Sequence, residues 1–117
     1  MTKVLVVEDN PLNMELVVEI LHTRGFTVHE AIDGEEAIKK FENDIYDLVI
    51  VDIELPGMDG VEVAKIIKNK NKKLPVIALT SYAMKGDKER FLAAGFDEYM
   101  SKPLDVMAFL KRLEKYH

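Results

Sequence analysis

Acidic residues directly follow two short apolar stretches of this chain. Glu8 and Asp9 come after residues 3–7, and Asp52 comes after the wholly apolar residues 48–51. Runs of this kind, rich in β-branched residues, are typical of strands that are covered on both faces in a parallel sheet. A carboxylate at the carboxyl end of such a strand lies where open α/β sheets bind ligands. Taken alone, however, either position could simply cap the loop or helix that follows.

Two further strand-like runs end in residues that could complete a site. Residues 75–80 end in the hydroxyl of Thr80, and residues 96–101 are followed by Lys102. Because the carboxyl ends of parallel strands gather at one edge of a sheet, we expect these side chains to meet the three carboxylates in one crevice.

The charge of this crevice indicates a divalent cation. Two carboxylates ~4 Å apart repel each other by about 4 kcal/mol at an effective dielectric constant near 20, and Lys102 alone leaves a surplus of negative charge. Magnesium fits, because it binds through one or two carboxylates and keeps several waters. A metal, a hydroxyl, a cation and a nucleophilic carboxylate together suit phosphoryl transfer, with Asp52 as the expected acceptor.

The segments between these runs predict the helices that connect the strands. Asn10 and Pro11 suit the start of a helix that ends at Gly25, and residues 33–36 form a capping pattern for the next helix. The expected strands are residues 3–7, 26–30, 48–51, 75–80 and 96–101, and the last two helices cover residues 87–94 and 106–113. Five βα units in succession predict a parallel sheet with helices on both faces and right-handed crossovers.

Size and composition restrict the classes of function. The 117 residues indicate one domain, residues 1–117. The chain has no cysteine, which excludes disulfides and thiolate zinc sites, and no apolar run nears the ~18 residues of a membrane span. We therefore expect a cytoplasmic protein without a membrane partner. The net charge of −5 argues against nucleic-acid binding, and the lysine-rich stretch 65–73 is taken as a solvated helix end and loop.

Four motifs, in this order along the whole chain, resemble the receiver domain of two-component response regulators. They are Val-Glu8-Asp9-Asn, Val-Asp52-Ile-Glu-Leu-Pro-Gly-Met-Asp-Gly60, Ala-Leu-Thr80-Ser and Met-Ser-Lys102-Pro103. The resemblance implies an α/β, doubly wound (βα)5 flavodoxin-like fold, with five parallel strands in the order 2-1-3-4-5.

The resemblance also implies a metal site and a phosphoacceptor. Asp52 would be phosphorylated. Asp9 and Asp52 would bind Mg2+ directly, together with the backbone carbonyl of Glu54. Glu8 would act mainly through a bound water.

Further roles follow from the same likeness. Lys102 would pair with the acyl phosphate, and the Thr80 hydroxyl would move to hydrogen-bond it. Tyr99 would turn inward as an aromatic switch, although it could simply pack against the last helix. The peptide bond before Pro103 is expected to be cis, and Ser81 matches a position that is kept small beside the phosphoryl group.

The implied phosphoryl donor is a sensor histidine kinase or a histidine phosphotransfer protein. The output surface would be the fourth helix, fifth strand and fifth helix, and the sequence does not identify the protein effector or choose between a monomer and a phosphorylation-dependent dimer. Residues 82–87 resemble the loop of stand-alone single-domain regulators of the DivK type and of receivers in hybrid kinases, so a domain of a longer protein remains an alternative. The chain would be a signalling protein and not an enzyme, although it would catalyse its own phosphorylation and dephosphorylation.

Three other functions are open to test. A haloacid-dehalogenase-like phosphatase would need an Asp two residues after Asp52, where this chain has Glu54. A pseudo-receiver would act without phosphorylation, and a flavodoxin-like nucleotide binder would need a Gly-rich loop after the first strand. Glu54 and Tyr82 also match positions at which the family tunes phosphoryl lifetime, which the sequence does not reveal. The scattered histidines are expected on the surface.

Overall fold

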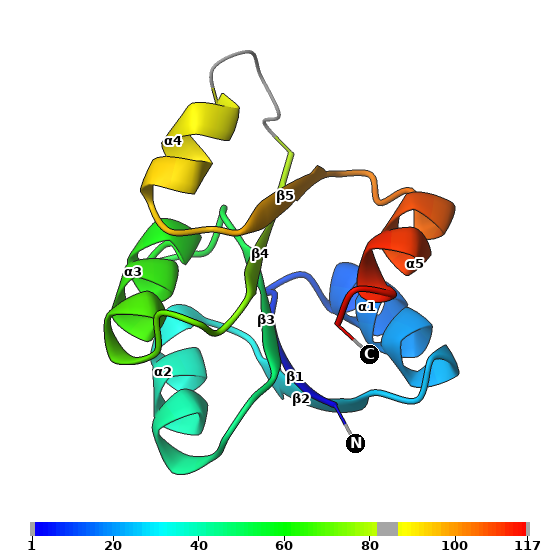
Figure 1. The fold of residues 1–117 in the computed structure, drawn as a ribbon, viewed down its shortest axis with the longest axis horizontal. Helices are drawn as coiled ribbons and strands as arrows, with labels where there is room; N and C mark the ends of the chain where they lie inside the picture. The colour runs from blue at the N-terminus through cyan, green and yellow to red at the C-terminus, as the bar shows by residue number, and fades with distance from the viewer. Residues whose placement is uncertain (1, 82–86, 117) are drawn as a thin grey trace.

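A computed structural model describes residues 2–81 and 87–116 of the chain (Figure 1). Strands and helices alternate throughout this part: β1 (Lys3–Val7), α1 (Pro11–Thr23), β2 (Thr27–Ala31), α2 (Gly34–Asn43), β3 (Leu48–Asp52), α3 (Gly60–Lys70), β4 (Val76–Thr80), α4 (Asp87–Ala93), β5 (Glu98–Ser101) and α5 (Val106–Leu113). The strands form one parallel sheet in the order β2-β1-β3-β4-β5. The predicted fold class is therefore confirmed. The loop expected between β4 and α4 falls largely on residues 82–86, outside the described residues.

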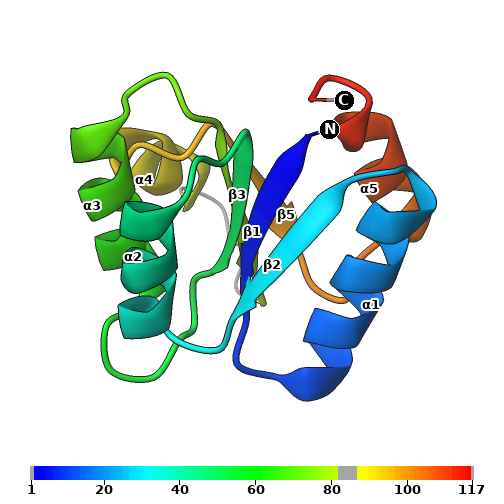
Figure 2. The ribbon, with the colours of Figure 1, turned by 90° about the horizontal axis from the view of Figure 1, so that it is seen from below.

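Helices cover both faces of the sheet, α1 and α5 on one and α2, α3 and α4 on the other (Figures 1 and 2). Successive side chains of a strand point to opposite faces, so each strand feeds two cores. In β1, Val4 and Val6 pack on the side of α1 and α5, whereas Leu5 and Val7 pack on the side of α2 and α3. Every residue of β3 and β4 is buried, which explains their almost continuous apolar sequences.

The strand register brings Glu8 and Asp52 together. Val7 of β1 lies opposite Val51 of β3. Glu8 follows Val7 in the chain and Asp52 follows Val51, so both carboxylates reach the same edge of the sheet. Their proximity therefore follows from parallel pairing and strand length.

The same register applies on the other side of β3. Asp52 lies opposite Leu79 of β4, and Thr80 lies opposite Ser101 of β5. The backbone N–H of Lys102 donates to the carbonyl of Thr80 at 2.8 Å, which extends the pairing past the end of β5. Thr80 and Lys102 therefore lie at the same edge as Asp52.

Side-chain caps fix where the helices begin. The Asn10 side chain accepts hydrogen bonds from the N–H groups of Leu12 and Asn13, at 2.9 and 3.1 Å, as expected for the N-cap of α1. Asp33 accepts from the N–H of Glu36 at 2.8 Å and caps α2. Each such cap is worth about 1 kcal/mol. Because α1 starts so soon after β1, the turn that carries Asp9 is short.

Three strands start later than the sequence predicts. The expected strands 26–30, 75–80 and 96–101 are observed as Thr27–Ala31, Val76–Thr80 and Glu98–Ser101. The N–H groups of Phe26 and Phe96 donate back to Leu21 and Phe91 and close the preceding helices, next to Gly25 and Gly95 with positive φ. This helix-ending motif uses the amides that a strand would need.

Two other expectations concern membranes and histidines. No helix in residues 2–81 and 87–116 is both long and apolar enough to span a bilayer, and the cytoplasmic location stays a prediction. His22 is exposed as expected, but His29 is half-buried, with Nδ1 2.8 Å from the Tyr46 hydroxyl. His117 lies outside the described residues.

Candidate functional site

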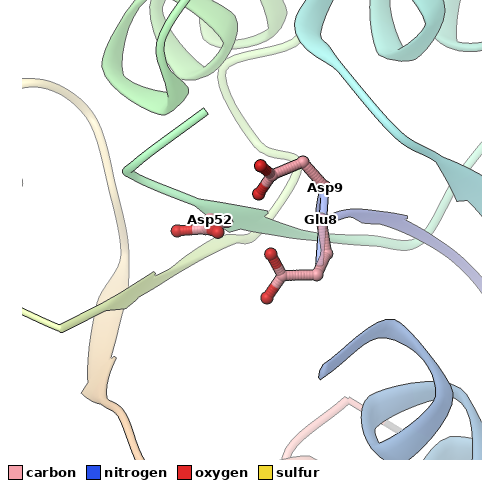
Figure 3. Close-up of side chains that lie close together, drawn as sticks. All are labelled: Glu8, Asp9 and Asp52. Atoms are coloured by element: carbon pink, nitrogen blue, oxygen red, sulfur yellow. The ribbon is translucent and has the colours of Figure 1, made fainter. Parts of the chain in front are cut away.

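Three carboxylates meet at the carboxyl edge of the sheet. Glu8, Asp9 and Asp52 each offer an oxygen atom, and these atoms all lie within 4.8 Å of one another. Glu8 and Asp52 are almost completely buried, with 1% and 2% of their surface exposed, whereas Asp9 is exposed. Figure 3 shows their carboxylates facing a common space beyond the ends of β1 and β3. The arrangement can hold a cation that prefers oxygen ligands.

Lys102 reaches into this cluster from the end of β5. Its Nζ atom lies 2.8 Å from Oε1 of Glu8 and 2.9 Å from Oδ2 of Asp52. The Lys102 side chain is only 15% exposed. The peptide bond between Lys102 and Pro103 is cis, the isomer expected from the sequence. The ammonium group therefore bridges the two buried carboxylates.

Backbone groups hold the other oxygens of the buried pair. Oδ1 of Asp52 accepts a hydrogen bond from the N–H of Glu54 at 2.9 Å, and Oε2 of Glu8 accepts one from the N–H of Asn10 at 3.3 Å. Gly60 packs directly on this segment, because a Cβ atom there would lie 2.3 Å from the carbonyl oxygen of Asp52. The β3–α3 connection therefore needs glycine at this position.

Burial and charge move the pKa values of the cluster in opposite directions. Burial raises the pKa of Glu8 to about 7, and the neighbouring Asp52 adds to this rise, while Lys102 opposes it. Burial also disfavours the charged form of Asp52. Its hydrogen bonds with Glu8, Lys102 and the backbone of Glu54 outweigh burial and hold the pKa of Asp52 below its ordinary value.

Lys102 is held in its charged form by the same contacts. Burial alone would lower the pKa of Lys102, but its hydrogen bonds to Glu8 and Asp52 raise it above the ordinary value. Near neutral pH, Asp52 is thus an anion beside an ammonium group. Glu8 is protonated in part of the molecules, because its pKa is about 7. An ionised Asp52 is the form that can act as a nucleophile.

The two expected switch residues, Thr80 and Tyr99, differ in burial. Thr80 is fully buried at the end of β4, beside the strand that carries Asp52. Tyr99 lies on β5 and is half-buried, with its ring centroid 5.7 Å from that of Phe91 in α4. The Tyr99 ring thus packs on Phe91 of α4, and not on the last helix as the simpler interpretation of the sequence predicts. Its switching role stays a prediction.

One contact of the site has no signal in the sequence. Oε1 of Glu54 accepts a hydrogen bond from the backbone N–H of Ser81 at 2.8 Å. The resemblance implies a metal ligand for the backbone carbonyl of Glu54 and matches Glu54 to a position that tunes phosphoryl lifetime, but it predicts no contact of this side chain with Ser81. Both residues lie in irregular segments, where a side-chain direction depends on tertiary packing and not on a periodic pattern.

Comparison with known proteins shows the family of the chain. Residues 4–114 match the model of the response regulator receiver domain. The chain belongs to the response regulator receiver family. The resemblance expected from the four motifs is confirmed, and a phosphoacceptor role in two-component signalling is the function consistent with the family.

Individual relatives of this receiver domain include both small regulators and a large kinase. It is 40% identical to the polar-differentiation response regulator DivK of Brucella ovis, over 99% of this chain and 97% of DivK. It is also 40% identical to hybrid signal transduction histidine kinase I of Dictyostelium discoideum, over 88% of this chain. The match covers only 6% of that kinase.

A solved structure of a relative has the same fold. The response regulator TrrA of Thermotoga maritima, in complex with Mg2+-BeF, superimposes with a TM-score of 0.90 and is 39% identical to this receiver domain. The superposition covers 100% of both chains.

Proposed function

We propose that this receiver domain, residues 1–117, accepts a phosphoryl group on Asp52 in a reaction that requires Mg2+. The observation that best supports this function is the bridge from Lys102 to the buried carboxylates of Glu8 and Asp52, at 2.8 and 2.9 Å. It gives Asp52 a charged, oriented form next to a cation that can neutralise a phosphate. The family match and the Mg2+-BeF complex of TrrA support the same function.

The residues around Asp52 fit a magnesium ion. Asp9 and Asp52 would bind it directly, the backbone carbonyl of Glu54 would add a third protein ligand, and Glu8 would act through a water. The cluster offers the hard oxygen donors that Mg2+ prefers. When bound, the ion supplies positive charge for the oxygens of the phosphoryl group.

Residues of the chain itself would carry out the transfer and bind the phosphoryl group. A carboxylate oxygen of Asp52 bonds to phosphorus as the bond from phosphorus to the donor's imidazole nitrogen breaks, and the released imidazole then takes up a proton. Lys102 pairs with the transferred group, and the Thr80 hydroxyl donates a hydrogen bond to it. Ser81 leaves room beside it because its side chain is small.

The proposed donor is a phosphohistidine on a sensor kinase or phosphotransfer protein. The output surface would comprise α4, β5 and α5, where a hollow of about 510 Å³ is lined by Leu92, Tyr99 and Arg112 among others. A protein effector would bind there. The domain would thus be a signalling protein in the cytoplasm, whose acyl phosphate forms and hydrolyses without turnover of an external substrate.

Phosphorylation with acetyl phosphate tests this function. We expect one phosphoryl group per chain with Mg2+ and none after chelation, as measured by intact mass. Asp52→Asn should abolish incorporation, because an amide is not a nucleophile of this kind. The matched control is Asp47→Asn, which should behave as wild type. Asp47 directly precedes the first residue of β3, at the end of the strand opposite to Asp52. Normal incorporation by Asp52→Asn would contradict the assignment.

A phosphatase of the haloacid dehalogenase type is the less supported alternative. Such an enzyme needs a general acid two residues after the nucleophile. Here the side chain of Glu54 instead contacts the backbone of Ser81. The prediction is therefore that the protein shows no turnover of small phosphomonoesters.

A further inference from the structure

We propose that the Glu54 side chain occupies the backbone amide of Ser81 in the unphosphorylated protein and must leave it before a phosphoryl group can bind there. Glu54 would then be an internal competitor of the phosphoryl group, which sets how readily the phosphorylated form is reached. This inference rests on the proposed phosphorylation of Asp52. It concerns the start of the reaction and not the lifetime of the product.

Glu54 connects the acceptor strand to the segment that follows β4. Its backbone N–H donates to Oδ1 of Asp52 at 2.9 Å, and its own Oε1 accepts from the N–H of Ser81 at 2.8 Å. One residue therefore touches both Asp52 and the Ser81 amide. Glu54 thus links the Asp52 carboxylate to the Ser81 amide through two hydrogen bonds.

The strand register puts the Ser81 amide at the same edge of the sheet as Asp52, directly after the neighbouring strand β4. Asp52 is opposite Leu79, and the carbonyls of Leu79 and Thr80 are used by the sheet, through the N–H groups of Ile53 and Lys102. Ser81 is the next residue beyond Thr80, and its N–H donates to a carboxylate instead of to a strand. A backbone N–H at the edge of a site is a ready donor for an anion.

The Glu54 carboxylate is only half satisfied in this position. Its Oε2 is buried, and among the described residues it has no hydrogen-bond partner. A buried carboxylate oxygen without a partner is unfavourable, because it has lost its water. Leaving Ser81 would restore hydration to Oε2, so the contact opposes phosphoryl binding without preventing it.

A phosphoryl group would use these donors more fully than the glutamate does. It carries three free oxygens, so one can accept from Ser81 while Lys102 neutralises another. Both donors are already within hydrogen-bond distance of carboxylates, which are the anions nearest to phosphate in charge and geometry. The Glu54 carboxylate thus stands in for one oxygen of the group that would replace it.

The alternative explanation is that the charge of Glu54 simply repels the phosphoryl group. The experiment must distinguish this repulsion from occupation of the Ser81 amide. Glutamine keeps an acceptor oxygen for the Ser81 amide but carries no charge, whereas alanine removes both. Glu62→Ala, an exposed carboxylate in the first turn of α3, provides a control for a lost charge near the same loop.

The experiment measures the affinity of each variant for beryllofluoride with saturating Mg2+, by NMR titration, and the hydrogen exchange of the Ser81 amide without either ligand. We expect Glu54→Ala to bind beryllofluoride roughly tenfold tighter than wild type, equivalent to about 1.4 kcal/mol. Glu54→Gln should lie closer to wild type, and Glu62→Ala should match it. The Ser81 amide should exchange faster in Glu54→Ala but stay protected in Glu54→Gln.

Equal gains in affinity for Glu54→Gln and Glu54→Ala would overturn the inference, because charge alone would then explain them. Unchanged affinity in Glu54→Ala, or unchanged exchange at Ser81, would also overturn it. Failure of wild type and Glu62→Ala to bind beryllofluoride with Mg2+ would instead refute the proposed phosphorylation of Asp52, and the inference with it.

Discussion

At the scale of single residues, Lys102 and the two buried carboxylates decide what this crevice can do. The ammonium group contacts Glu8 and Asp52 together, and the exposed Asp9 lies nearby. Burial raises the pKa of Glu8 to about 7, while the contacts of Asp52 keep its pKa low. The two carboxylates thus differ in role: one is an anion ready to react, and the other can take up a proton near neutral pH.

This difference in pKa predicts that magnesium binding is coupled to the release of a proton. In the metal-free protein Glu8 carries a proton below about pH 7, and Mg2+ favours ionised carboxylates. Binding should therefore release a proton, and affinity should fall as the pH drops through about 7. Calorimetry in buffers of different ionisation enthalpy measures the release.

Glu8→Gln supplies the control for this linkage. It should bind Mg2+ with little pH dependence near neutrality, because it has no proton to release. Equal pH dependence in wild type and Glu8→Gln would show that another group titrates.

Side-chain proximity at this scale was predictable only where the backbone fixes it. Asp52 ends β3, and Glu8 and Lys102 directly follow β1 and β5, so parallel pairing brings all three to one edge whatever their rotamers. The contact between Glu54 and Ser81 depends instead on the path of a loop and on one side-chain direction. Neither leaves a periodic pattern in the sequence.

At the scale of elements, α5 is fixed to the edge strand β5 through a partly buried carboxylate. Glu98 accepts a hydrogen bond from the Tyr116 hydroxyl and pairs with Arg112 at 2.6 Å. Its side chain is 12% exposed. Burial opposes the charge of Glu98, but Tyr116 and Arg112 outweigh it and hold its pKa below the ordinary value. The output surface proposed above includes this contact.

Acid should weaken this attachment. Because the folded-state pKa of Glu98 lies below its unfolded value, its stabilisation is present above the ordinary glutamate pKa and is lost as the pH falls. Glu98→Gln should lower the free energy of unfolding by about 1 kcal/mol at neutral pH. The difference should vanish in acid.

Urea unfolding at neutral and acid pH measures this difference, with the exposed Glu19→Gln on α1 as the control. A constant difference between Glu98→Gln and wild type at all pH values would contradict the expected role of the charge.

Element boundaries were predictable where caps and hydrophobic runs agree. Asn10 and Asp33 cap their helices as their types predict. The starts of β2 and β5 were placed too early, because Phe26 and Phe96 are apolar like strand residues. Their amides close a helix, and an apolar side chain does not reveal where its own N–H donates.

At the scale of the whole molecule, alternating strands and helices predict a parallel sheet but do not specify its order. Several orders of five strands satisfy the same alternation with right-handed crossovers. The order β2-β1-β3-β4-β5 was available beforehand only through the resemblance to receiver domains, and the structure has it. This order puts β1 and β4 on either side of β3, so Asp52 has the acidic pair on one flank and Thr80 on the other.

Whether Asp52 carries the phosphoryl group can be measured in the wild-type protein without any substitution. The wild-type protein is phosphorylated by a phosphorylated histidine kinase with Mg2+ and reduced at once with borohydride, which converts an aspartyl phosphate into homoserine. Peptide mass spectrometry then locates the converted residue. We predict homoserine at position 52 alone. Homoserine in place of another aspartate, with position 52 unchanged, would show that Asp52 is not the phosphoacceptor.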